Sequence, residues 1–157
     1  MRLSLMFCTL LLSLGLTRME AQQSSGQIAK PEPLGLTTWI PSPTVPGAAR
    51  MLLVGDPAKH TIFAARFRFP DGVRLGPHWH TATVYATVLQ WKLVLGFGDH
   101  VDSSAVKEYG PGSFIVFEGG VRHFEWFRGE TILHVEGVGP SKTEFLNPAD
   151  DPLKAKK

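Results

Sequence analysis

Apolar and polar residues alternate through most of the chain after about residue 39. In the segment 61–69 every second side chain is apolar and arginines stand between them, which predicts a β-strand with one buried face. The other predicted strands are 50–54, 85–97, 106–109, 113–117, 123–127 and 131–138. We expect a bend or hairpin near Gln90 and Trp91, because Lys92 interrupts the longest segment. Many short strands separated by turn signals predict an all-β sandwich or barrel.

The first residues follow a different pattern. An apolar stretch over 3–16 follows Arg2 and is too short for a comfortable membrane span, so residues 1–21 are predicted to be a signal peptide and the protein to be periplasmic or secreted. An uncleaved anchor is the alternative. The only cysteine, Cys8, lies in this segment, so the exported chain would contain no disulfide. Finding an intact Met1 in the exported fraction by mass spectrometry would contradict the cleavage.

The rest of the chain is predicted to be one domain with short flanking segments. Residues 22–36 are rich in Gln, Ser, Gly and Pro, which is typical of a flexible lead. The folded domain is expected over 37–152, followed by a basic tail at 153–157. A chain of 157 residues with a net charge of +2 can bury a core but has little to attract nucleic acid.

The stretch with the strongest candidates for a functional site contains two histidines. The stretch Gly72 to Val84 reads G-V-R-L-G-P-H-W-H-T-A-T-V and places His78 and His80 two residues apart. On a strand both would point to one face, where two imidazoles can bind one metal ion. The spacing alone is weak evidence, because two ordinary histidines near a turn occur often by chance.

A second glycine-framed stretch strengthens this interpretation. From Gly112 the chain reads G-S-F-I-V-F-E-G-G-V-R-H, so that a predicted strand ends in a Gly-Gly turn and His123 begins the next apolar segment. Together the two stretches resemble the two motifs of the cupin family, and the likeness extends from about Trp39 to Pro152. The group it resembles is that of small single-domain bacterial cupins. This resemblance implies a small β-barrel, or jelly roll.

The resemblance also implies a metal site with three histidine ligands, His78, His80 and His123. Three neutral imidazoles suit one divalent ion, with zinc, iron or manganese expected before copper or nickel, and they leave positions open for water or substrate. The family glutamate is missing, since Val84 and Tyr85 stand where it should fall. In the second motif Glu118 and Phe127 replace the family's proline and asparagine. A fourth ligand is therefore not assigned by the resemblance.

Several residues could replace the missing carboxylate. Glu125 lies two residues after His123 and shares its face if the strand is regular. His134 and Glu136 alternate on the next predicted strand, and their face cannot be read from the sequence. Each of these could act as a fourth ligand or a general base. Tyr85 could donate a hydrogen bond to a substrate, although simple wall packing would explain it too.

Two classes of function remain open from the sequence. The first is an exported metal-dependent enzyme, an oxygenase, isomerase or lyase, with Glu125 or Glu136 moving protons. Its substrate would be a small organic molecule, for which an anion is one option. The second is a small-molecule binding or sensing protein with a weak or empty metal site, which Val84 favours. In either class the partner is a small-molecule ligand, no stable membrane span remains after signal removal, and a homodimer is compatible with the sequence.

Overall fold

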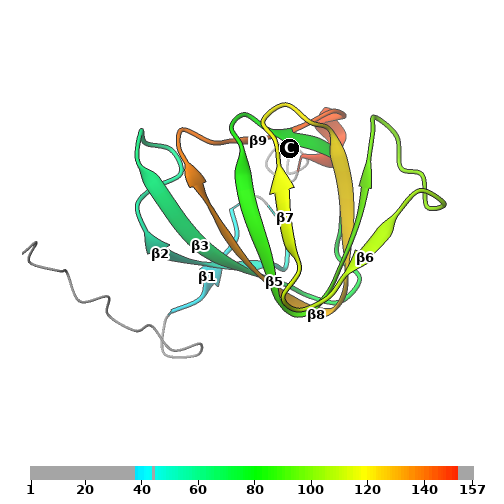
Figure 1. Ribbon diagram of the computed structural model, residues 1–157, viewed down its shortest axis with the longest axis horizontal. Helices are drawn as coiled ribbons and strands as arrows, with labels where there is room; N and C mark the ends of the chain where they lie inside the picture. The colour runs from blue at the N-terminus through cyan, green and yellow to red at the C-terminus, as the bar shows by residue number, and fades with distance from the viewer. Residues whose placement is uncertain (1–37, 44, 152–157) are drawn as a thin grey trace, which may run out of the picture. The chain divides into compact units, whose positions relative to one another are not determined.

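The computed structural model describes residues 38–43 and 45–151, almost all of them in strands and turns (Figure 1). The strands are β1 (Ile40–Pro41), β2 (Ala49–Val54), β3 (Ile62–Phe69), β4 (Arg74–His80), β5 (Val84–Phe97), β6 (Lys107–Tyr109), β7 (Phe114–Phe117), β8 (His123–Val138) and β9 (Thr143–Phe145). A single-turn 3₁₀-helix spans Pro148–Asp150. Within these ranges no helix has the length and apolar character needed to cross a membrane.

Some predictions fall outside these residues. The predicted signal peptide (1–21), flexible lead (22–36) and basic tail (153–157) are not among the residues that the structure describes. The described part of the predicted domain, by contrast, forms one antiparallel sheet.

The sheet has the strand order β1-β2-β3-β8-β4-β9, and β5 pairs with β6, β7 and β8. Figure 1 shows this sheet curling, with β5 and β8 bending sharply so that β6 lies on the opposite side of the view from β2 and β3. This is the curled antiparallel sheet of a small β-barrel, and it confirms the predicted all-β fold. Its inner face is therefore the place where side chains from distant segments meet.

The bend lies where β5 and β8 face each other. Trp91 has a positive φ of 58°, and the pairing with β8 shifts register on both sides of Gln90, which confirms the predicted bend. On β8, Gly129 has a φ of 75°, and a Cβ there would lie 2.4 Å from the Trp91 side chain. Only glycine fits this position, because the backbone is left-handed and the indole occupies the space.

The predicted break between residues 127 and 131 is wrong, because β8 runs through it as one strand, His123–Val138. The backbone N–H of Gly129 donates to Oδ1 of Asp71 at 2.7 Å, so the residue at the bend keeps a hydrogen-bond partner. The strand can thus turn the corner without ending.

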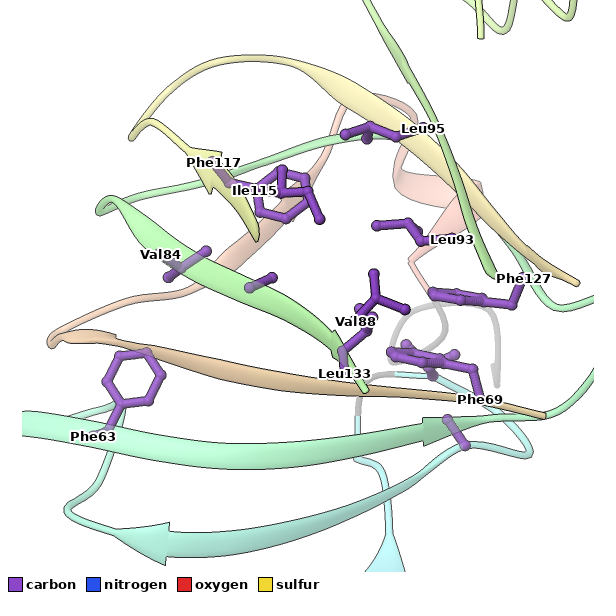
Figure 2. Close-up of a cluster of buried hydrophobic side chains, with 13 residues drawn as sticks. Phe63, Phe69, Val84, Val88, Leu93, Leu95, Ile115, Phe117, Phe127 and Leu133 are labelled. Carbon is purple, nitrogen blue, oxygen red and sulfur yellow. The ribbon is translucent and has the colours of Figure 1, made fainter. Parts of the chain in front are cut away.

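The core lies on the inner face of the curled sheet. Figure 2 shows Phe63, Val88 and Leu133 projecting into the same interior from β3, β5 and β8. The rings of Phe69 and Phe127 stack with centroids 3.9 Å apart. The inward face predicted for segment 61–69 is confirmed. Since each buried side chain of this size contributes roughly 1.5–3 kcal/mol, the barrel has a source of stability that does not depend on a metal.

Candidate metal centre

Three histidines from two neighbouring strands meet on the inner face. His78 and His80 lie at the end of β4, and His123 begins β8 shortly after the Gly-Gly turn at 119–120. His78 and His123 are paired in register. One ligand nitrogen from each of the three rings lies within 4.8 Å of the others, and the ring centroids of His78 and His123 are 4.2 Å apart. The structure therefore brings together the three predicted metal ligands.

Backbone carbonyl groups orient two of the rings. Nδ1 of His78 lies 2.8 Å from the carbonyl oxygen of Gly76, and Nδ1 of His123 lies 3.0 Å from that of Val121. A carbonyl oxygen only accepts, so in each ring Nδ1 carries the proton and Nε2 keeps a free lone pair. This is the tautomer that a histidine needs in order to bind a metal through Nε2.

The third ring is held by a residue that sequence reasoning missed. Nδ1 of His80 lies 3.2 Å from Oγ1 of Thr143, on the short strand β9 beside β4. The hydroxyl can donate or accept, so this contact orients the ring without fixing its tautomer. The alternation of Thr143, Glu144 and Phe145 was the only sequence signal for β9, and nothing local indicated that it pairs with β4.

Burial keeps the three imidazoles neutral. Loss of water, reinforced by the neighbouring His123, lowers the pKa of His78 to about 4. Loss of water together with the two other rings lowers the pKa of His80 to about 3. The pKa of His123 is also lowered, chiefly by burial. Neutral rings can act as ligands without first releasing a proton.

One buried nitrogen without a hydrogen-bond partner indicates that a metal ion fits the site. Nε2 of His123 is buried and lacks a hydrogen-bond partner in the part of the chain that the structure describes. A buried polar atom without a partner is costly, and a metal ion would supply one. Two nitrogens bound at about 2.1 Å to one tetrahedral ion lie ~3.4 Å apart, so ligand atoms that are up to 4.8 Å apart need to approach one another by little more than an ångström. The donor set fits a divalent ion.

A cavity of about 550 Å³ lies beside the cluster and is lined by His78 and His80. Most of its walls are apolar, formed by residues such as Phe63, Phe67 and Leu133. This volume lies within the range of small-molecule sites, which are concave and mostly apolar with a few polar groups. The ring of Phe117 lies against His123, with centroids 4.5 Å apart, and completes an apolar surround for the histidines.

The missing glutamate leaves an apolar wall. Val84 is only 4% exposed and lines the same cavity as His78 and His80, so it does face the site. Glu125 is buried and lines the cavity as well. Burial raises its pKa to about 8. Its carboxyl oxygens are not part of the group of ligand atoms that lie within 4.8 Å of one another, so Glu125 shares the cavity without joining the three histidines.

The two other predicted site residues point away. Tyr85 and Glu136 face each other in the β5–β8 register, one residue out of step with Val84 and Gly137. Tyr85 is 39% exposed and stacks on Phe114. The side chain of Glu136 is 51% exposed and lies 3.6 Å from Nε2 of His134. Strand alternation places both on the outer face, on the other side of the sheet from the three histidines.

Comparisons with known proteins support the fold. No protein-family model matches the sequence, and no curated protein has a significantly similar sequence. Among solved structures, an acetylacetone dioxygenase from Acinetobacter johnsonii is similar with a TM-score of 0.58 at 14% identity, over 94% of this chain and 88% of that one. An RmlC-like cupin from Shewanella frigidimarina has a TM-score of 0.52 at 17% identity, over 67% and 86%.

A third similar structure is much larger. Salicylate 1,2-dioxygenase from Pseudaminobacter salicylatoxidans has a TM-score of 0.52 at 14% identity over 63% of this chain, which spans only 30% of that protein. At these identities the likeness concerns the fold alone, and it agrees with the resemblance of the two histidine motifs. The chain has the cupin fold, with its three histidines in one cluster on the inner face.

Proposed function

We propose that this protein is a metal-dependent enzyme that acts on a small organic molecule bound in the cavity of about 550 Å³. The observation that carries the proposal is the convergence of three neutral histidines, of which His78 and His123 are buried and His80 is half-buried. In the two buried rings Nδ1 contacts a backbone carbonyl and Nε2 is left free. An arrangement of this kind has little use as packing, because three imidazoles in one place fill space less favourably than aliphatic side chains would.

The chemistry follows from which residues surround the histidines. A divalent ion held there would supply a Lewis acid for an oxygen of the substrate. Glu125 lies in the same cavity, and its burial places its pKa at about 8, so the carboxyl group can hold or accept a proton near neutral pH. Val84 and Phe117 are buried and give the cavity apolar wall beside the histidines. Glu125 is therefore the proposed proton carrier of the site.

Oxygenase chemistry is the first reaction class to test. Two of the similar structures are dioxygenases, of acetylacetone and of salicylate. Protein purified without a histidine tag should contain close to one equivalent of divalent metal by mass spectrometry. The iron-loaded form should consume oxygen with one of these two compounds or a close analogue. Absence of metal from the tag-free protein, with no uptake on adding zinc, iron or manganese, would sink the proposal.

The alternative function is a binding or sensing protein with a weak metal site. Val84 favours it, because the position that carries an anionic ligand in the resembled family is apolar here. Ligand binding that is unchanged by metal removal, together with no turnover in any metal form, would support this function over the enzyme. Export to the periplasm or medium remains a separate proposal that rests on the apolar stretch 3–16.

A further inference from the structure

The cavity contains an arginine that the metal chemistry does not use. Arg50 lies on β2 and lines the same cavity as the histidines. It is paired in register with Phe67 of β3, whose ring also lines the cavity. Leu52, two residues further along β2, lines it as well. The inner face of β2 therefore presents one cation among apolar side chains.

The guanidinium of Arg50 has no partner in the part of the chain that the structure describes. Its Nε is buried without a hydrogen bond, and no ion pair or ring contact involves it. Four other arginines in the described ranges are engaged: Arg122 with Asp99, Arg128 with Glu108, Arg68 with the Trp39 ring and Arg74 with the Trp126 ring. Arg66 also has buried nitrogens without a partner, but it does not line the cavity. A partly buried charged donor that lacks a partner is unfavourable, so this one is suited to receive an anion.

We propose that Arg50 anchors the carboxylate of the molecule that occupies the cavity, which makes the ligand a small organic acid with an apolar body. This inference rests on the proposed function for its reactive end, but the anchoring itself does not require a metal. The planar guanidinium fork matches the two oxygens of a carboxylate.

The rest of the cavity agrees with such a ligand. Phe63, Phe69 and Leu133 offer apolar surface for its body, and the histidines lie on the same lining for its reactive end. Besides Arg50 and Glu125, the charged residues of the lining are one cation, Lys142, and two carboxylates, Glu144 and Asp151. Arg50 lies beside the apolar wall of the cavity, because it is paired in register with Phe67.

The experiment compares acids with their neutral amides on the full chain. Benzoate and phenylacetate are titrated calorimetrically against benzamide and phenylacetamide, first with chelator-treated protein and then with zinc-loaded protein. We expect the acids to bind at least about tenfold more tightly than the amides in both forms, since a charge-assisted hydrogen bond is stronger than a neutral one. Equal affinities for acid and amide, no binding of any probe, or an acid preference that vanishes with the metal would each overturn the proposal.

Variants locate the effect. Arg50→Gln should weaken binding of the acids about tenfold or more and leave the amides unchanged, while Arg50→Lys should keep part of the acid preference. Arg66→Gln is the matched control, because Arg66 on β3 is also half-buried with an unpartnered Nε but does not line the cavity. An equal loss in Arg66→Gln, or none in Arg50→Gln, would overturn the assignment.

The design separates this inference from the proposed function. Metal content is measured on each variant, and Arg50→Gln should bind metal like the parent. A protein that binds no metal but still prefers acids through Arg50 would leave the inference standing while the enzyme proposal failed. The acid–amide comparison on the parent protein needs no variant, so it remains decisive even if Arg50→Gln folds poorly.

Discussion

Strand β8 carries the same His-x-Glu spacing twice, with opposite results. His123 and Glu125 are buried on the inner face, next to the other histidines and the cavity. His134 and Glu136 lie on the outer face, where the side chains are 27% and 51% exposed and Nε2 of His134 lies 3.6 Å from a carboxylate oxygen of Glu136. The two-residue spacing puts the members of each pair on a common face of the strand. The curvature of the sheet then decides which pair lies near the other potential metal ligands.

The difference in surroundings changes the chemistry of identical side chains. Burial lowers the pKa of His123 and raises that of Glu125 to about 8, so both inner groups favour their neutral forms. The outer pair meets solvent, and a contact between exposed side chains of this kind contributes little to stability. A site for a metal and a substrate thus requires the enclosed face, because there the ion would be the strongest charge available to these groups.

The largest expected effect comes from removing a histidine on each face. His123→Ala should weaken metal binding at least about a thousandfold, or ~4 kcal/mol, because one of three ligands is lost. His134→Ala should leave the affinity unchanged. Competition with a metallochromic indicator measures both. Equal metal affinity in the parent and His123→Ala would place the ion elsewhere, and a similar outcome for His80→Ala would remove the three-histidine site altogether.

The second prediction concerns the stability of the metal-free protein at different pH values. The pKa of Glu125 in the folded protein, about 8, lies above its ordinary value of 4.5. Between these values the folded state binds more protons than the unfolded state. The contribution of Glu125 to the stability of the folded protein is therefore complete below about pH 4.5 and is lost as the pH rises through about 8. The neutral histidines act in the opposite sense, since the pKa values of His78 and His80 are lowered from 6.5, and their contribution is lost as the pH falls below 6.5.

Urea unfolding with chelator present separates the two contributions. From pH 5 to pH 9 the unfolding free energy of the parent should fall by on the order of 3 kcal/mol more than that of Glu125→Gln, because glutamine does not ionise. Glu136→Gln, the same change on the outer face, should follow the parent. Parallel curves for the parent and Glu125→Gln would show that this carboxyl group reaches solvent and is not held on the enclosed face.

The sequence was sufficient for the parts of the site that depend on local geometry. Two-residue spacing predicted that His78 and His80 share a face, and both line the cavity. The Gly-Gly turn predicted that His123 begins a strand, and it does. The bend near Trp91 was also predictable, because a charged residue interrupted an apolar run. Each of these features is fixed within a few residues.

The parts that were missed depend on long-range contacts. The expected break near Gly129 hid the fact that β8 keeps its alternation from His123 to Gly137, and this alternation is what sends Glu136 outward. The contact of Thr143 with His80 and the place of Arg50 at the cavity arise from strand pairings that no local pattern encodes. Such pairings are determined by how the whole sheet packs.

The smallest expected effect comes from adding a carboxylate on each face of β5. Val84 faces the cavity and Tyr85 faces out beside Glu136, so Val84→Glu and Tyr85→Glu are neighbouring changes with opposite orientations. The histidines are neutral ligands, so a bound dication would keep its full charge. Val84→Glu should therefore raise metal affinity about tenfold, or ~1.4 kcal/mol, and weaken the binding of azide to the metal-loaded protein.

Tyr85→Glu should change neither quantity, because its carboxylate would lie in solvent on the other side of the sheet. Metal titration of both variants, with azide binding followed on the cobalt-substituted forms, makes the comparison. If Val84→Glu leaves metal affinity unchanged while Glu125→Ala abolishes it, then Glu125 moves onto the ion when the metal binds. Val84 would in that case only pack against its neighbours. The inner face would then hold a site with four ligands, which forms only when the metal binds.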